Sequence, residues 1–120
     1  MGIRRVMPDI RSGALEESKR FYGRLGLVEV MDLGWVVTMA SPSNPTAQVT
    51  FFDENAAEAV EPDLSVEIED VAAVDPLHAE LAAAGAEIVM PPRDEPWGVR
   101  RFFVRDPNGK VVNVVAHRPD

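Results

Sequence analysis

The sequence contains no cysteine and only two histidines, His78 and His117. A disulfide framework, a thiolate nucleophile and a cysteine-ligated metal are therefore excluded. No apolar run approaches membrane-spanning length, and the residues after Met1 lack the apolar core of a signal peptide. We therefore expect a cytoplasmic protein that has no membrane partner. For both histidines, an ordinary solvent-facing position is a stronger interpretation than a catalytic role.

Basic residues are missing from a long middle stretch, since no Lys or Arg occurs between Arg24 and Arg93. The formal net charge is -8. Nucleic-acid binding requires a basic surface to neutralise phosphates, so we expect no nucleic-acid partner. Most of the acidic side chains in the middle stretch are expected to form a solvated surface.

At 120 residues and 46% hydrophobic content the chain predicts one folded domain spanning residues 1–120. Apolar alternation and β-branched runs predict strands at 4–10, 28–31, 35–40, 48–52, 64–68 and 88–90, the last ended by two prolines. Helical spacing predicts two helices. In the first, Leu15, Phe21, Tyr22 and Leu25 share one face, and Asp75 is expected to cap the second.

The last quarter of the chain predicts a β-hairpin around Asp106-Pro107-Asn108-Gly109. Direct pairing across a turn of that length places Val104 opposite Val111, Phe102 opposite Asn113 and Arg100 opposite Val115. The resulting sheet face mixes polar and apolar side chains. A face of that kind suits a ligand pocket better than a dry core.

The two halves of the chain repeat one plan, and the second copy begins about 60 residues after the first. Each half predicts strand, helix and three strands, with module one at about 1–56 and module two at about 61–120. The predicted fold class is α+β, in which two βαβββ modules form a curved, barrel-like mixed sheet around a cavity.

The residues 18–27, SKRFYGRLGL, and the hairpin at 96–113 resemble the vicinal oxygen chelate superfamily. That superfamily includes glyoxalase I, extradiol dioxygenases and bleomycin-resistance proteins. The resemblance implies metal-ligand positions at Met7, Asp63, Asn113 and either Gln48 or Thr50. A thioether and a neutral amide suit the divalent ions of such sites poorly. We therefore expect no metal and no cofactor.

Two tryptophans, Trp35 and Trp97, precede strands at equivalent places in the two modules and could stack on a flat ligand. Ordinary core or dimer packing is the alternative for each. A salt bridge to Asp94 or Glu95 is the alternative for Arg100. The full predicted ligand-binding set is Met7, Trp35, Phe51, Asp63, Glu67, Trp97, Arg100, Phe102 and Asn113.

These observations predict a metal-independent protein that resembles the bleomycin-resistance type. It would bind a planar or aromatic small molecule between the modules, with antibiotic sequestration as one use, and would form a homodimer. Catalytic residues cannot be assigned, and whether the protein is an enzyme stays open. One alternative is a metal-dependent lyase, isomerase or extradiol-type dioxygenase, or an enzyme with a carboxylate base such as Glu67. Another is a structural dimerisation module.

Overall fold

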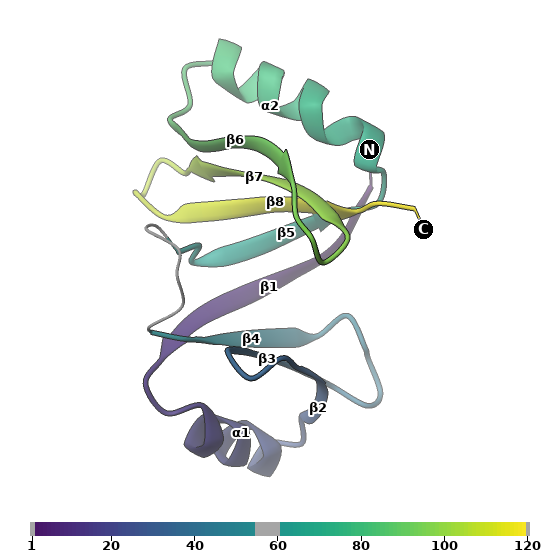
Figure 1. Ribbon diagram of the computed structural model, residues 1–120, viewed down its shortest axis with the longest axis vertical. Helices are drawn as coiled ribbons and strands as arrows, with labels where there is room; N and C mark the ends of the chain where they lie inside the picture. Colours follow the sequence, from purple (N-terminus) through teal and green to yellow (C-terminus); the bar gives the residue numbers. More distant parts are fainter. Residues whose placement is uncertain (1, 55–60, 120) are drawn as a thin grey trace. The chain divides into compact units, whose positions relative to one another are not determined.

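The computed structural model describes residues 2–54 and 61–119 of the chain and has two compact units. One unit comprises residues 6–61, and the other comprises residues 1–5 together with 62–120. Strand β1 (Ile3–Ser12) contributes its first residues to the second unit and the rest to the first. Figure 1 shows one helix lying against the strands of each unit.

The first unit follows the order strand, helix and three strands. After β1 come α1 (Leu15–Arg24), β2 (Val28–Asp32), β3 (Val36–Ala40) and β4 (Gln48–Asp53). Its strands lie in the order β2-β3-β4-β1, with β1 parallel to β4 and the other neighbours antiparallel. The second unit repeats this plan with β5 (Leu64–Ile68), a 3₁₀ turn at Val71–Ala73, α2 (Val74–Ala83), β6 (Ile88–Asp94), β7 (Val99–Arg105) and β8 (Val111–His117).

In the second unit the strand order is β5-β8-β7-β6, with β5 parallel to β8 and the other pairs antiparallel. Two βαβββ modules are thus present, and the predicted α+β fold class is confirmed. The order of strands and helices was sufficient for this prediction, because turn residues separate the strands and β-branched or alternating runs mark them.

Each helix covers an apolar core on one face of its own sheet. In the first unit, Phe51 and Val37 are buried beneath Leu15 and Tyr22 of α1. The Tyr22 and Phe51 rings lie 5.0 Å apart. Full burial of a phenylalanine side chain contributes about 1.5–3 kcal/mol. Of the four residues expected on the buried face of α1, Leu15 and Tyr22 pack against the core, whereas Phe21 and Leu25 are 59% and 68% exposed.

The core of the second unit lies between α2 and the central strands β8 and β7. Its fully buried members include Phe102 and Val74, and Leu77 and Leu81 of α2 pack against them. The expected N-cap of α2 is wrong. Asp70 accepts a hydrogen bond from the Ala72 N–H and caps the preceding 3₁₀ turn, while Asp75 lies within the first turn of α2.

Strand β6 continues through Pro91 and Pro92, which corrects the expected end of this strand at the prolines. β6 is the last strand in the order of its unit, and its pairing with β7 shifts register between Met90 and Arg93. Proline is tolerated at such edges and bulges because no ladder hydrogen bond is lost there.

The register of the β7–β8 hairpin differs by one residue from the expected one. Phe103 pairs with Asn113, and Arg101 pairs with Val115. The Asp106 N–H donates to the Lys110 carbonyl at 2.8 Å, so three residues form the loop instead of four. A one-residue slip exchanges the partners that share a sheet face, so Asn113 lies beside Phe103 and not beside Phe102.

The hairpin turn is held by Asp106 and Gly109. The Asp106 carboxylate accepts the N–H groups of Lys110 and Asn108 at 2.9 and 2.8 Å. These bonds, that to Lys110 above all, hold the pKa of Asp106 below its usual value. Gly109 has φ of +82°, the left-handed residue that closes a three-residue hairpin loop.

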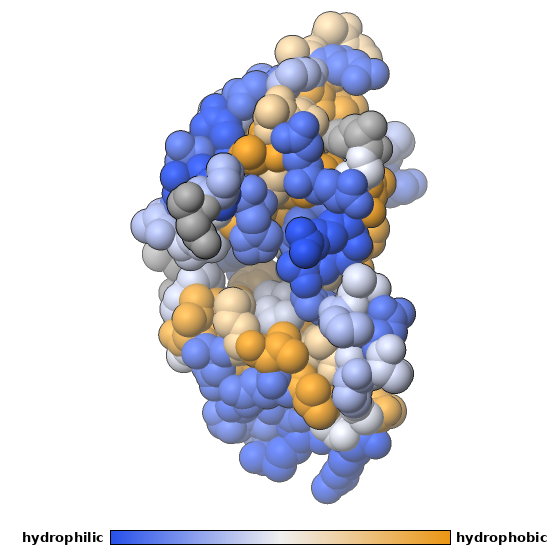
Figure 2. All heavy atoms as spheres, turned by 90° about the vertical axis from the view of Figure 1, so that its right-hand side faces the viewer, coloured by the Kyte–Doolittle hydropathy of each residue, from blue (hydrophilic) through white to orange (hydrophobic). Residues whose placement is uncertain are grey.

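Hydrophilic side chains predominate on the face of the molecule shown in Figure 2. None of the helices among the described residues is both long enough and apolar enough to cross a membrane.

Candidate functional site

The sheet of the second unit has one face away from α2, which we call the helix-free face. Pairing places Ser65, Asn113 and Phe103 in one row across β5, β8 and β7, and Glu67, Val115 and Arg101 in the next. All six side chains are buried. A sheet face that buries a carboxylate, a guanidinium, an amide and a hydroxyl is not an ordinary apolar core.

Asn113 lies at the centre of the first row. Its Nδ2 donates to Ser65 Oγ at 3.0 Å, and the residue is 8% exposed. The second polar atom of this amide, Oδ1, is buried and has no hydrogen-bond partner among residues 2–54 and 61–119. Buried polar atoms are nearly always paired in folded proteins. Asn113 therefore carries one buried acceptor atom that the described residues leave unpaired.

Glu67 is the buried acid of the second row, at 3% exposure. Its Oε1 accepts from both Nε and an Nη of Arg5 at 2.7 Å. Arg4 lies 3.5 Å from Oε2, and the exposed His117 ring lies 3.7 Å from Oε1. These contacts fix the predicted site residue Glu67 beneath the first residues of β1.

Arg101 occupies the end of the second row, between two aromatic rings. Its guanidinium carbon lies 5.1 Å from the Trp97 ring centroid and 4.7 Å from that of Phe103. One Nη donates to the buried Glu95 carboxylate at 2.9 Å, and Arg93 bonds the same carboxylate. Cation–π stacking and the ion pair together hold the guanidinium in place.

Trp97 is displayed on the short turn between β6 and β7. The Gly98 N–H donates to the Glu95 carbonyl, and Arg118 donates to that same oxygen at 2.9 Å. Gly98 has φ of +93°, which favours glycine at this position of the turn. The Trp97 side chain is 47% exposed. A fixed turn thus presents a large aromatic surface at the edge of the helix-free face.

Arg100 does not share the helix-free face with Asn113, so its expected position is wrong. Its Nε and one Nη bond both carboxylate oxygens of Asp75 in α2 at 2.8 Å, and another Nη bonds Asp94 at 3.2 Å. The hydrogen bonds to Arg100 lower the pKa of Asp75, and those to Asp75 and Asp94 raise the pKa of Arg100. The expected alternative of a salt bridge to Asp94 is what the structure contains.

Two of the remaining predicted residues lie in the cores beneath the helices and not on the helix-free face. Phe102 lies under α2, where its ring centroid is 5.4 Å from that of His78 in an edge-to-face arrangement, and Phe51 lies under α1. Asp63 precedes β5, and its carboxylate accepts the Val111 N–H at 2.8 Å. Met7 and Trp35 belong to the first unit, where Trp35 is 42% exposed.

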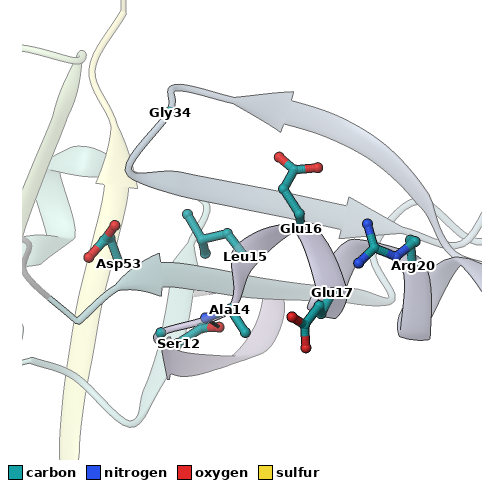
Figure 3. Close-up of a pocket in the computed structure, with 9 residues that line it drawn as sticks. Ser12, Ala14, Leu15, Glu16, Glu17, Arg20, Gly34 and Asp53 are labelled. Carbon is teal, nitrogen blue, oxygen red and sulfur yellow. Dashed lines mark hydrogen bonds between the residues drawn. The ribbon is translucent and has the colours of Figure 1, made fainter.

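A shallow pocket of about 430 Å³ lies in the first unit at the start of α1 (Figure 3). Its carboxylates come from α1 and from β4, and Glu16 pairs with Lys19 at 2.9 Å. Acidic residues in a first helical turn also stabilise the helix dipole without a ligand. No residue of the predicted ligand-binding set lines this pocket, whose wall is formed by Ser12, Gly13, Ala14, Leu15, Glu16, Glu17, Arg20, Gly34 and Asp53.

The side chains at the expected ligand positions do not fit a catalytic metal. Asp63 is engaged by a backbone N–H, Asn113 offers an amide and Met7 a thioether. Manganese and zinc sites use carboxylate oxygens and imidazole nitrogens. Within residues 2–54 and 61–119, no three His, Cys, Asp or Glu side chains gather where they could hold a metal ion.

Comparison with known proteins agrees with the duplicated architecture. The profile of the Glyoxalase/Bleomycin resistance protein/Dioxygenase superfamily matches residues 2–114. The chain belongs to this superfamily. The match covers both βαβββ modules and confirms the resemblance found in residues 18–27 and 96–113. No curated protein matches the chain.

Solved structures of superfamily members and other proteins share the fold. A hypothetical protein of Bacillus halodurans is 10% identical at a TM-score of 0.75, with 100% of this chain and 98% of that chain covered. Methylmalonyl-CoA epimerase of Mycobacterium tuberculosis is 17% identical at 0.68, with 98% and 89% covered. The Mn(II)-bound glyoxalase of Novosphingobium aromaticivorans is 20% identical at 0.66, with 98% and 41% covered. At such identities the likeness establishes the superfamily's fold and not an activity.

Sequence reasoning missed Ser65, Glu95, Arg101 and Phe103. The available signal was the hairpin loop, because Gly109 at the left-handed position of a three-residue loop sets the register that joins Arg101 and Phe103 to Asn113. No local pattern marks Glu95 as buried. Its burial depends on two arginines supplied by neighbouring strands.

Proposed function

We propose that this superfamily member is a metal-independent protein that binds a planar organic molecule at the helix-free face of its second module. The observation that carries the proposal is the half-exposed Trp97, held on a hydrogen-bonded turn and backed by the Arg101 guanidinium. Sequestration of an aromatic drug is one biological use consistent with it.

Trp97 suits a stacking role because its position is fixed before a ligand arrives. The ring has two rotatable side-chain bonds, and its turn is tied to Arg118 and Val99 by backbone hydrogen bonds. An aromatic surface ordered in advance loses little conformational entropy on binding. Asn113 would supply a polar group that orients a ligand on this face, and the ion-paired Glu67 and Arg101 would hold the surrounding side chains in place.

The test uses the two tryptophans separately. The Trp35→Phe variant leaves Trp97 as the sole tryptophan, and Trp97→Phe leaves Trp35. We expect planar aromatic compounds to quench Trp97 fluorescence saturably in the first variant. Calorimetric titration of Trp97→Ala with the same compounds should show weakened binding. A broad screen of planar and glycosylated aromatic compounds without any saturable quenching would count against the proposed function.

The metal-dependent lyase, isomerase or dioxygenase alternative is less well supported by the donor chemistry. Asp63 is the one carboxylate among the expected ligand positions, and it already accepts the Val111 N–H. We expect protein purified without added metal to contain no stoichiometric manganese, zinc, nickel or iron. Elemental analysis that found one equivalent would restore the enzymatic alternative, as would turnover of methylglyoxal hemithioacetal or a catechol.

The ligand roles predicted for Met7 and Trp35 stay predictions.

We also propose that the protein is a homodimer. The proposal draws support from large apolar side chains that are exposed on the first unit, among them Phe21, Leu25 and Leu33 at 54–68% exposure. Apolar surface of this kind is often an association site. Sedimentation analysis should give twice the chain mass, and Leu25→Lys should shift the equilibrium toward monomer. A monomer at micromolar concentration would contradict it, and would also remove the dimerisation-module alternative.

A further inference from the structure

The amide of Asn113 presents an unequal pair of polar atoms. Nδ2 donates to Ser65 Oγ at 3.0 Å, whereas Oδ1 is buried and accepts no hydrogen bond from the part of the chain that the structure describes. Pairing places Phe103 opposite Asn113 on β7, so an aromatic side chain shares the helix-free face with this amide. An amide oxygen can only accept, and leaving it unsatisfied away from water is unfavourable. A group that donates to Oδ1 therefore gains an interaction that none of the described residues makes.

The charged groups of the same face have partners within the second unit. Glu67 is bonded by Arg5 at 2.7 Å, and Arg101 is bonded to Glu95 at 2.9 Å. A ligand that brought its own charge would have to compete with these buried ion pairs, which are costly to break. An anionic carboxylate would in addition meet the Asn113 oxygen without a proton to donate.

We infer that the ligand is an uncharged planar molecule that donates an O–H or N–H at its edge to Asn113 Oδ1. Phenols, indoles and lactams have this chemistry. The inference rests on the proposed function and goes further, because it excludes aromatic carboxylates and ethers as preferred ligands. It also makes Asn113 a specificity-determining residue, in place of the metal ligand that its position in the superfamily implies.

Matched probes isolate the donor. 2-Naphthol and 2-methoxynaphthalene differ by one O–H, and indole and 1-methylindole differ by one N–H. Equilibrium dialysis against wild-type protein should give tighter binding of the donor in at least one pair, by about tenfold, which corresponds to about 1.4 kcal/mol. 2-Naphthoate should bind more weakly than 2-naphthol.

Two variants assign the effect to the amide oxygen. Asn113→Leu has a similar shape and no acceptor, so the donor and its methylated analogue should bind it equally. Asn113→Asp keeps an acceptor and should retain the preference, which guards against a leucine variant that fails to fold. Circular dichroism spectra should match the wild type for any variant that is compared.

The outcomes separate this inference from the proposed function. Equal affinities within both pairs, a preference that persists in Asn113→Leu, or tighter binding of 2-naphthoate would overturn the inference while leaving planar-ligand binding intact. Failure of every compound in the broad fluorescence screen would remove the proposed function and this inference with it.

Discussion

The ion pair between Arg5 and Glu67 should be one of the stronger polar contributions to the free energy of unfolding. The two side chains are 22% and 4% exposed, and Arg5 bonds Glu67 Oε1 twice at 2.7 Å. Two unit charges about 4 Å apart attract by about 4 kcal/mol at an effective dielectric constant of about 20. Desolvation offsets part of this gain. Arg4 is 61% exposed and lies 3.5 Å from the other oxygen, where solvent screens the attraction.

We therefore expect Glu67→Gln to lower the free energy of unfolding by about 3 kcal/mol, because it leaves the Arg5 guanidinium without its counter-charge. In double-mutant cycles with Arg5→Met the coupling energy should be about 2–3 kcal/mol, and with Arg4→Met below about 1 kcal/mol. Methionine keeps the aliphatic contacts of the arginine stem. Urea unfolding followed by circular dichroism and tryptophan fluorescence measures all six proteins. Equal coupling for Arg4 and Arg5 would refute the reasoning from burial.

Three further predictions concern the turn, the core and acid stability. Gly109→Ala should lower the free energy of unfolding by about 1–2 kcal/mol, because φ at this residue is +82°. Gly23→Ala in α1 should raise it by about 0.5–1 kcal/mol, because the added Cβ meets nothing within 4 Å. Phe102→Ala should cost about 3–5 kcal/mol because the ring is 0% exposed, and urea midpoints that matched the wild type would disprove its place in the core. The hydrogen bond from Arg100 lowers the folded-state pKa of Asp75. Ionised Asp75 therefore adds its full contribution to the free energy of unfolding above about pH 4, and this contribution is lost as the pH falls below that value. Urea midpoints of Asp75→Asn should consequently depend less on pH below about pH 4 than those of the wild type do.

The order of elements could be predicted because it depends on patterns that the sequence carries locally. Leu64 to Ile68 alternates cleanly between apolar and polar residues, and the structure makes it β5. Pro91 and Pro92 show the limit of local patterns. Proline has no N–H to donate, so it ends a strand only where that strand must form hydrogen bonds with neighbours on both sides. Whether β6 has a second neighbour is a property of the whole unit.

The candidate site was harder to predict because it depends on one register. Both strands of the hairpin alternate as expected, but loop length decides which side chains of β7 lie beside Asn113. A loop of four residues joins Asn113 to Phe102 and Arg100, and the observed loop of three joins it to Phe103 and Arg101. The choice depends on the backbone conformation of Gly109 and its neighbours, which composition alone does not determine.

Glu95 and Arg101 could not be predicted as site residues from the sequence, because both are charged and yet buried. Patterning places ionisable residues outside, and each of these would be costly to bury alone. Both are buried because Arg101 bonds Glu95 and stacks on Trp97. The same reasoning gives the helix-free face its functional interest. Its charges have partners that the fold provides, whereas the oxygen of Asn113 is buried without a partner among the described residues, so one interaction that a ligand could add there is a hydrogen bond donated to an amide.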